Sequence, residues 1–459
     1  MDAPAQNVFL HIFIVATLWY FFLLNSFYGL LIICTLPEIL RRNRELKLEN
    51  LEKLIISETL PSVSIIIPAY NEEKKIVDTV TALLEISYPY KEIIIVSDGS
   101  EDATLKNLIE HFALKREPPL APEIIATKPL RGYYRSDIHP NLIVIDKENG
   151  GKGDAINAGL NVASFTLFTA IDADTVIEKD SLLRMIRPFL TKENCIAQGG
   201  TLRVQNGCVV KHGRVQKVFF PKNLLPGIQA VEYLRAFLFG RLGWNKLGGN
   251  FIVSGAFGFF SREKVIKVGG YDVNTVGEDL ELSLRLVHNF STKKKRAFIN
   301  FIPDPVAWTL VPTTLRHLGR QRERWFRGLL ESFWKHKNMM WRPKYGIFAF
   351  TSVPYMLFGE ILQPFVELAC YISVIYGFIV EGFSWDFFWL FFFITWGLTM
   401  IYTLAAVILE MMTFKRYNYA EELGEILLSV IIENLGFRQL NMYWRIRGIG
   451  KVFRKSREW

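Results

Sequence analysis

The sequence has little cysteine, no glycine repeat and slightly fewer charged residues than most soluble proteins. Only 4 of its 459 residues are Cys, so no disulfide framework is expected. Charged residues make up 22% of the chain, against about 25% in typical soluble proteins, and glycine follows no Gly-X-Y period. The Walker pattern Gly-x-x-x-x-Gly-Lys-Ser/Thr is also absent. Disulfide-stapled, disordered and collagen-like proteins and P-loop nucleotide sites are therefore excluded.

Apolar residues are plentiful, and they are gathered in segments. Half of the chain (50%) is hydrophobic, and the mean hydropathy is +0.18. From Val8 to Leu36 there is no Lys, Arg, Asp or Glu, which is enough helix to cross a bilayer. The residues before this run lack the basic region of a signal peptide and include Asp2, so we expect an uncleaved anchor. Two further apolar regions cover Tyr345–Val380 and Trp385–Leu409.

The basic surplus, a net charge of +9, lies beside these apolar segments. Basic residues follow the first span at Arg41–Lys47 and fill Arg445–Arg457, whereas Glu381–Asp386 contains acids but no Lys or Arg. The positive-inside rule therefore predicts that the middle of the chain and the C-terminus lie in the cytoplasm. The expected location is the plasma (inner) membrane. The lipid bilayer is an expected partner, and nucleic acid is not. Two short segments, Gly346–Phe358 and Ile426–Phe437, are expected to be interfacial or re-entrant.

Between the first and second apolar regions, strand patterns alternate with helix patterns. The alternation predicts a mostly parallel sheet with right-handed crossovers, whose ligands bind at the carboxyl ends of the strands. The stretch Lys115–Pro140 has several prolines and no clear period, so a surface insertion is expected there. The expected strands are Ser62–Pro68, Glu92–Val96, Leu142–Ile145 and Phe165–Ile171, and the clearest helices are Asp154–Val162 and Lys179–Phe189.

Two carboxylates close one of these strands, in the run Asp172-Ala173-Asp174. Because strand side chains alternate, Asp172 and Asp174 should point the same way. Two hard oxygen ligands at one place suit Mg²⁺ or Mn²⁺. The alternative is a turn and capping role for Asp174.

Two further motifs lie at expected helix starts. Gly150-Gly151-Lys152-Gly153 permits close backbone approach and offers a cation to an anion, although a plain glycine loop is an equal alternative. In Gly277-Glu278-Asp279, the carboxylate of Asp279 fits a general base. Glu278 and Glu281 fit equally well as charges that the helix dipole favours.

The segment 316–342 is predicted to be an amphipathic helix on the cytoplasmic membrane surface. Its apolar stripe carries Leu318, Trp325, Leu329 and Phe333, and the segment includes Gln321-x-x-Arg324-Trp325. A simpler interpretation makes Trp325 an interfacial anchor.

Taken together, these motifs resemble those of the membrane-embedded family 2 glycosyltransferases, which include cellulose, chitin, hyaluronan and poly-N-acetylglucosamine synthases. Ser254–Gly258 and Gly436–Leu440 are most similar to the bacterial branch near the poly-N-acetylglucosamine synthases. Ser97 stands where many members have a second Asp. This difference weakens the assignment of a uracil-binding site to Ser97–Ser100 but does not remove it, because Asp98 is present. The motifs that carry the resemblance, in the family's order, are Ile67–Glu72, Ser97–Ser100, Asp172–Asp174, Gly277–Asp279 and Gln321–Trp325.

The resemblance implies a GT-A-like α/β domain inserted between transmembrane helices, and it implies roles for the site residues. Asp279, with Glu278 beside it, would deprotonate the acceptor, and Asp172 and Asp174 would hold Mg²⁺ or Mn²⁺. The substrate-binding residues would be Tyr70, Glu72 and Asp98 for the uridine, Lys152 and Arg324 for the diphosphate, and Gln321 and Trp325 for the acceptor glycan. Ala69 and Asp172 would also bind the substrate.

The expected activity is inverting transfer from a UDP-sugar, with UDP-N-acetylglucosamine the candidate donor, to a growing β-linked polysaccharide that the chain itself secretes. The alternatives are a transferase that adds one or a few sugars to a lipid or short acceptor, and a nucleotide-binding membrane regulator without catalysis. An accessory export subunit is left open. The expected divisions are an N-terminal transmembrane helix at 1–40, a linker at 41–60, the catalytic domain at 61–315, the amphipathic helix at 316–342, transmembrane helices at 343–413, and an interfacial segment with a basic tail at 414–459.

A route for the polymer is expected along the second membrane helix. Glu360, Gln363 and Glu367 share one face of that helix, and polar side chains at membrane depth usually face a hydrated interior. Glu433 and Asn434 would face the same cavity. The alternative is that the acids lie at the membrane boundary or pair with Arg438.

Overall fold

The computed structural model describes residues 3–48, 60–118, 122–192, 194–380, 384–414, 416–417 and 419–453. Most of the predicted linker, residues 49–59, lies outside the described residues. So do residues 381–383 of the predicted external turn, Lys415 and the last six residues of the basic tail.

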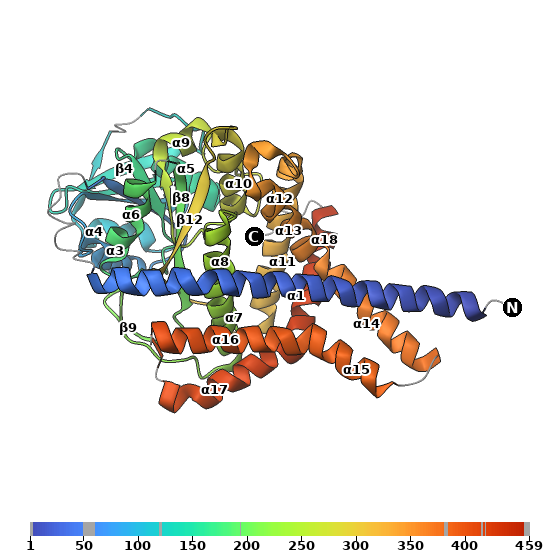
Figure 1. Cartoon of the computed structure of the whole chain (residues 1–459). Coiled ribbons are helices and arrows are strands. Elements are labelled where there is room, and N and C mark those ends of the chain that lie inside the picture. The colour runs from blue at the N-terminus through green and yellow to red at the C-terminus, as the bar shows by residue number, and fades with distance from the viewer. Residues whose placement is uncertain are drawn as a thin grey trace.

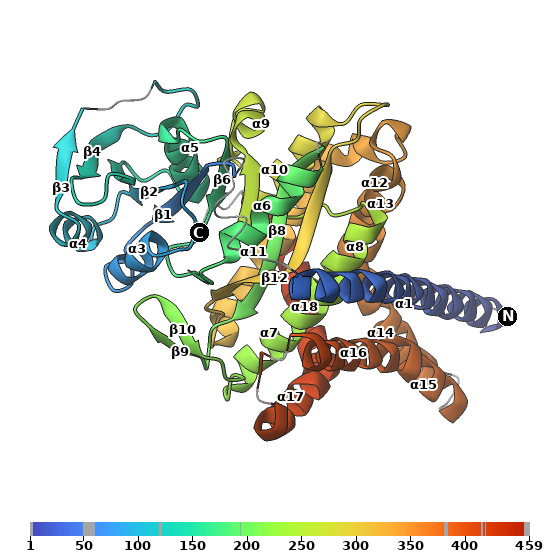
Figure 2. The same cartoon turned by 60° about the vertical axis from the view of Figure 1, so that its left-hand side comes forward.

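A large mixed sheet forms the centre of the protein (Figures 1 and 2). Its strand order is β3-β4-β5-β2-β1-β6-β11-β8-β12-β7, and the run β5-β2-β1-β6 is parallel, as the alternation of strands and helices predicted. A separate two-stranded sheet pairs β9 with β10. The strands are β1 (Val63–Ala69), β2 (Lys91–Asp98), β3 (Leu114–Glu117), β4 (Leu130–Ser136), β5 (Leu142–Lys147), β6 (Leu167–Ala170), β7 (Val176–Ile177), β8 (Cys195–Val204), β9 (Val209–Lys211), β10 (Arg214–Lys217), β11 (Gly258–Ser261) and β12 (Phe298–Thr309).

Helices cover both faces of this sheet, because its central strands are apolar on both sides. In β1, Ile65 and Ile67 belong to one core cluster and Ile66 to the other, so successive side chains face opposite layers. The helices of this domain are α3 (Ile76–Leu84), α4 (Thr104–His111), α5 (Lys152–Val162), α6 (Ser181–Thr191), α7 (Leu224–Leu234), the π-helical segment η1 (Arg235–Arg241), α8 (Leu242–Leu247), α9 (Arg262–Lys267), α10 (Glu278–Phe290) and α11 (Leu315–His336).

The stretch Lys115–Pro140, expected to be a surface insertion, is mostly exposed but contains two strands that the sequence did not predict. Strand β4 pairs antiparallel with β5, and β3 pairs with β4, which extends the sheet at one edge. Tyr133 of β4 is buried against the core, where it provides the apolar anchor of this edge. Pro129 lies directly before β4, and the prolines of this stretch made the short alternating pattern of β4 difficult to recognise in the sequence.

Three helices are long and apolar enough to cross a membrane, as predicted: His11–Leu46 within α1, Gln363–Val380 and Trp385–Thr413. Helix α1 contacts the other two, and the helices extend to one side of the sheet domain (Figure 1). Helix α1 (Ala3–Leu48) continues through the first part of the predicted linker. The remaining elements are η2 (Lys337–Met339), η3 (Pro343–Tyr345), α12 (Ile347–Phe350), α13 (Ser352–Tyr355), η4 (Met356–Ile361), α14 (Gln363–Val380), α15 (Trp385–Phe392), η5 (Phe393–Gly397), α16 (Leu398–Thr413), α17 (Tyr419–Ile432), η6 (Glu433–Phe437) and α18 (Arg438–Phe453).

The two short apolar segments are broken helices. Gly346–Phe358 contains α12, α13 and the start of η4, whereas Ile426–Phe437 comprises the end of α17 and η6. The chain bends in η6 at Leu435 and Gly436, where Gly436 takes a φ of +111° that glycine adopts without strain.

The predicted amphipathic helix is present as α11, but other parts of the chain cover much of its apolar stripe. Leu318 and Phe333 are buried, and the helix packs against α10 on one side and α18 on another. The prediction that this stripe faces the membrane is therefore wrong for Leu318 and Phe333, which are buried inside the protein. Trp325 stays 42% exposed, which leaves it open to a ligand.

Candidate active site

The glycine loop before α5 is held from below by a buried charge cluster. Asp98, at the end of β2, accepts hydrogen bonds from the backbone N–H groups of Gly150 and Gly151 at 3.0 and 2.7 Å. Lys147, fully buried at the end of β5, pairs with Asp98 at 2.6 Å and with Asp154 at 2.5 Å. Gly151 has a φ of +87°, which the sharp turn into α5 requires.

These contacts give Asp98 a positioning role in addition to the role expected for it. Its side chain is 5% exposed, and both carboxylate oxygens are engaged by the protein itself. Oδ1 of Asp98 accepts from both Lys147 and Gly150, whereas Oδ2 accepts only from Gly151 and keeps a lone pair for another donor. Asp98 therefore positions the glycine loop, and Ala69, Tyr70 and Glu72 lie at the neighbouring strand end.

Glu72, Asp172 and Asp174 gather at the carboxyl ends of β1 and β6. Burial raises the pKa of Asp174 above its ordinary value, and neighbouring Asp172 raises it further. Burial also raises the pKa of Glu72, with Asp174 the next contributor. The repulsion of Asp174 by Asp172 fits a cation bound to this pair, because a cation would relieve it.

Lys152, the first residue of α5, reaches across to these acids. Its Nζ lies 2.5 Å from Asp172 Oδ1 and donates to the carbonyl of Gly255 at 3.3 Å. Burial by itself lowers the pKa of Lys152, but Asp172, Glu278 and Asp279 outweigh burial and raise it. Lys152 is therefore a charged group that lies between the Asp172–Asp174 pair and the start of α10.

Asp279 is oriented by two backbone groups in the first turn of α10. Its Oδ2 accepts the N–H of Gly255 at 3.0 Å, and its Oδ1 accepts the N–H of Leu280 at 2.8 Å. The adjacent Glu278 is half-buried; partial burial raises its pKa, and Asp279 raises it further. Each oxygen of Asp279 keeps a lone pair for another donor, so the carboxylate is both fixed and able to accept a proton.

Helix α11 brings the Gln-x-x-Arg-Trp motif to the same place. Backbones of α10 and α11 meet at Gly277 and Gly328, where a Cβ on Gly328 would lie 2.7 Å from Gly277 Cα. Arg324 is exposed and acts electrostatically on Glu278. The Oε1 atom of Gln321 is buried and has no hydrogen-bond partner among the described residues.

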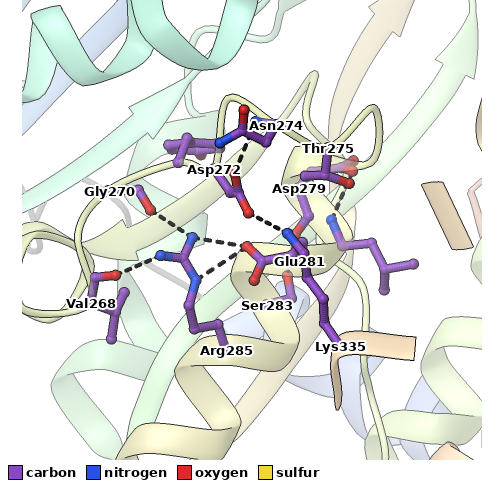
Figure 3. A network of polar contacts seen from close by, with 12 residues as sticks. Val268, Gly270, Asp272, Asn274, Thr275, Asp279, Glu281, Ser283, Arg285 and Lys335 are labelled. Atoms are coloured by element: carbon purple, nitrogen blue, oxygen red, sulfur yellow. Dashed lines mark hydrogen bonds and ion pairs between the residues drawn. The ribbon is translucent and has the colours of Figure 1, made fainter. Parts of the chain in front are cut away.

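The loop that enters α10 is fastened at several points (Figure 3). The Arg285 guanidinium donates to the carbonyls of Val268 and Gly270 at 2.5 and 2.7 Å, and pairs with Glu281 at 2.9 Å. Lys335 of α11 pairs with Asp272 in this loop. Figure 3 shows Arg285 directed at Val268 and Gly270 and Lys335 directed at Asp272, so the loop that leads to α10 is held in place.

A cavity of about 400 Å³ leads from this region toward the candidate spans. Trp325 and Trp244 line it beside the catalytic domain, and Thr399 and Gln363 line it on the apolar helices. Segments η1, η4 and η6 all contribute to its wall, and π-helical segments are frequent at functional sites.

Of the five residues predicted to face such a cavity, Glu360, Gln363 and Glu433 line it, whereas Glu367 and Asn434 are buried behind it. The expected alternative also occurs, because Glu367 pairs with Arg438 at 3.1 Å. The other two acids are paired as well, Glu360 with Arg445 at 2.7 Å and Glu433 with Arg235 at 2.5 Å.

Sequence reasoning missed several residues of the site. Lys147 is one of these residues, and its place at the end of a buried strand is the only sequence feature that could have identified it. Gly255 was recognised only within a motif of the resembled family, although its N–H and C=O contact Asp279 and Lys152. The pair Arg322–Glu232, at 2.6 Å, carried no sequence signal because 90 residues separate its members.

The chain is similar to several known proteins. Curated relatives include poly-beta-1,6-N-acetyl-D-glucosamine synthases of Staphylococcus epidermidis, 30% identical over 276 residues, and of Staphylococcus aureus (strain COL), 29% identical over 271 residues. Each match covers 59% of this chain, but only 56% and 55% of the relatives' own lengths.

Two solved structures are similar at a more distant level. A mannosyltransferase from Pyrobaculum calidifontis, solved with GDP-Man and Mn²⁺, has a TM-score of 0.48 at 15% identity, with 90% of this chain and 99% of that chain covered. Residues 1–349 of S. aureus TarS give a TM-score of 0.39 at 14% identity, with 82% and 91% covered.

Two family profiles match the chain. The profile of glycosyl transferase family 2 matches residues 64–122, which hold β1 and β2 with their polar strand ends. The profile of glycosyl transferase family group 2 matches residues 167–411, more than half of the chain, from β6 through Asp279 and Trp325 to the last candidate span. The chain therefore belongs to the family 2 glycosyl transferases.

Proposed function

We propose that the protein is an inverting, UDP-sugar-dependent glycosyltransferase that lengthens a β-linked glycan at the cytoplasmic face of the plasma (inner) membrane and secretes it. One observation carries this proposal: a single cavity joins Trp325, of the Gln-x-x-Arg-Trp motif, to polar side chains on the candidate spans. A transferase that modifies a small acceptor needs no such passage. The names of the staphylococcal relatives support UDP-N-acetylglucosamine as the donor.

In this proposal, an acceptor hydroxyl attacks the anomeric carbon of the donor sugar while Asp279 accepts the hydroxyl proton. The bond between that carbon and the diphosphate breaks, and UDP leaves. Lys152 and Arg324 offset the negative charge that develops on the diphosphate. A single displacement inverts the configuration, so an α-linked donor gives a β-linked product without a covalent enzyme intermediate.

Asp172 and Asp174 fit a Mg²⁺ or Mn²⁺ ion, because burial and mutual repulsion raise the pKa of Asp174. No group of three or more His, Cys, Asp or Glu residues that could hold a metal occurs in the described part of the chain. Donor phosphate oxygens and water would therefore complete the coordination. When bound, such an ion neutralises charge on the diphosphate.

The test uses the full chain, purified and reconstituted into lipid vesicles, with separate nucleotide sugars added outside. Each reaction contains Mn²⁺, Mg²⁺ or EDTA, and UDP release, product length and product location are measured together. We expect UDP release from UDP-N-acetylglucosamine only with a divalent ion, and long product inside the vesicles. Long lumenal product from the chain alone also means that export needs no accessory subunit.

Two outcomes would change the assignment. Products of one or a few sugars, outside the vesicles or on lipid, would support a non-processive transferase instead. No UDP release from any nucleotide sugar would contradict the proposed function altogether.

A further inference from the structure

The arginines that line the cavity are not equivalent. Four of the five pair with a glutamate: Arg235 with Glu433, Arg322 with Glu232, Arg438 with Glu367 and Arg445 with Glu360. Among the described residues, the fifth, Arg241, has no carboxylate at ion-pair distance. Its Nη1 donates to the carbonyl of Ile252 at 3.0 Å, and its guanidinium lies 4.6 Å from the ring centroid of Phe237.

An unpaired guanidinium in such a place is unfavourable unless a ligand completes it. Burial lowers the pKa of Arg241 to about 10, although Asp279 opposes that shift. Its Nε and Nη2 atoms donate to no protein atom among the described residues and are not sealed from the cavity. A guanidinium has five N–H donors, so most of the donors of Arg241 remain for a ligand.

The position of Arg241 indicates which ligand that is. Asp279 acts electrostatically on both Lys152 and Arg241, so the carboxylate lies near both cations. Lys152 is on the side of the Asp172–Asp174 pair and does not line the cavity, whereas Arg241 lines it together with Trp325. Arg241 is also the last residue of η1, a π-helical segment of the kind often found at functional sites.

We propose that Arg241 binds the terminal sugar of the acceptor glycan and donates hydrogen bonds to its oxygen atoms, so that the attacking hydroxyl faces Asp279. The ligand class is a hexopyranose with hydroxyl or acetamido oxygens at the reacting end. The inference depends on the proposed function, because it needs an acceptor glycan. Arg241 is thus an acceptor-binding residue, separate from the donor cations Lys152 and Arg324.

The experiment compares Arg241→Gln and Arg241→Lys with a matched control, Lys246→Gln. Lys246 is an exposed cation one turn later on the same continuous helix, so its replacement removes the same charge outside the cavity. For each purified full chain, UDP release from UDP-N-acetylglucosamine is measured against concentration of a short β-linked N-acetylglucosamine oligosaccharide, with Mn²⁺ present. Donor KM, acceptor-independent hydrolysis of the donor and UDP binding are measured in parallel.

We expect Arg241→Gln to raise the acceptor KM about 10- to 100-fold, the effect of losing a charged hydrogen-bond donor. Donor KM, hydrolysis and UDP binding should stay within about 2-fold of the parent, since Arg241 is on the acceptor side. Arg241→Lys keeps the charge but loses the forked arrangement of N–H donors. Its acceptor KM should therefore lie between that of the parent and that of Arg241→Gln. Lys246→Gln should behave as the parent.

Several results would overturn the inference. An unchanged acceptor KM in Arg241→Gln excludes acceptor binding, and equal loss of donor and acceptor use assigns Arg241 a structural or donor role. If Arg241→Gln fails to fold, the Arg241→Lys variant is used instead, and an unchanged acceptor KM in that variant also excludes acceptor binding by Arg241. These results are distinguishable from failure of the proposed function, in which the parent chain itself transfers no sugar.

Discussion

Single side chains in this site divide into those that meet the substrate and those that hold other groups in place. Trp325 lines the cavity and Asp279 is half-buried near Lys152, whereas Asp98 and Lys147 are buried beneath the glycine loop. Substitutions in the first group should change rates, and substitutions in the second should change stability first.

Asp279→Asn tests the base. The amide keeps the size of the side chain but cannot accept a proton, so turnover should fall about 10²- to 10⁴-fold. UDP binding should be retained, because Lys152 and the Asp172–Asp174 pair are unchanged. Initial rates of sugar transfer and equilibrium binding of UDP, measured on the same preparation, check this. Near-normal turnover would show that another group deprotonates the acceptor.

Lys147→Met tests the charge cluster under the glycine loop. It leaves Asp98 and Asp154 buried without their shared cation, and breaking a buried pair costs about 3–5 kcal/mol. The thermal unfolding midpoint of the purified protein should fall accordingly. The control is Lys115→Met, whose partner Asp137 is on the surface, and it should leave the midpoint in place. Equal behaviour of the two variants would mean that the cluster does not stabilise the fold.

At the scale of elements, the site depends on how closely α10 and α11 approach. Glycines at the crossing, Gly277 and Gly328, leave no side chain between the two backbones. This contact places the helix that carries Asp279 beside the helix that carries Arg324 and Trp325. The network of Arg285 and Lys335 in Figure 3 fixes the loop on the other side of Gly277.

Gly328→Ala should separate the two helices. The new Cβ would lie 2.7 Å from Gly277 Cα, and neither atom belongs to a flexible side chain that can move away. We expect a lower unfolding midpoint and a loss of acceptor use greater than any loss of UDP binding. Gly424→Ala is the matched control, because a Cβ there meets nothing within 4 Å and alanine favours a helix. A Gly328→Ala variant as stable and active as the control would contradict this account of the crossing.

Elements with strong local patterns were predictable, and weaker ones were not. Strands β1, β2, β5 and β6 have continuous apolar runs, since they are buried on both faces, and each was found within a few residues. Strands β3 and β4, at one edge of the sheet, were missed because they are short and partly exposed, and their formation depends on the pairing of β3 with β4 and of β4 with β5. The site motifs were found because polar residues follow directly after such apolar runs.

At the scale of the whole molecule, buried ion pairs join the sheet domain to the apolar helices. Arg42 near the end of α1 makes a bidentate pair with Asp304 of β12, at 2.7 and 2.6 Å. Arg203 of β8 pairs with Glu410 of α16, with side chains 1% and 0% exposed. The catalytic domain is therefore attached to the first and last candidate spans by charged contacts as well as by packing.

A double-mutant cycle on Arg203 and Glu410 tests this attachment. Arg203→Met or Glu410→Met alone leaves one buried charge without its partner, so each should destabilise the protein by about 3–5 kcal/mol. The double variant should recover much of that loss, because two apolar side chains replace the pair without an unpaired charge. Unfolding midpoints and the activity of all four proteins are the readout. Additive losses would show that the two residues act independently.

The sequence by itself determined the apolar spans, the alternation of strands and helices, and the motifs Asp172–Asp174 and Gly277–Asp279, because each depends on residues within one short segment. Only the tertiary structure decided that Asp98 serves Lys147 and the glycine loop, and that the glutamates of the cavity are already paired with arginines. Only the tertiary structure shows, too, that Arg241 has no carboxylate partner in the described part of the chain. These outcomes depend on which side chains meet across long sequence separations, such as Arg235 with Glu433, and local patterns do not encode the packing that brings them together.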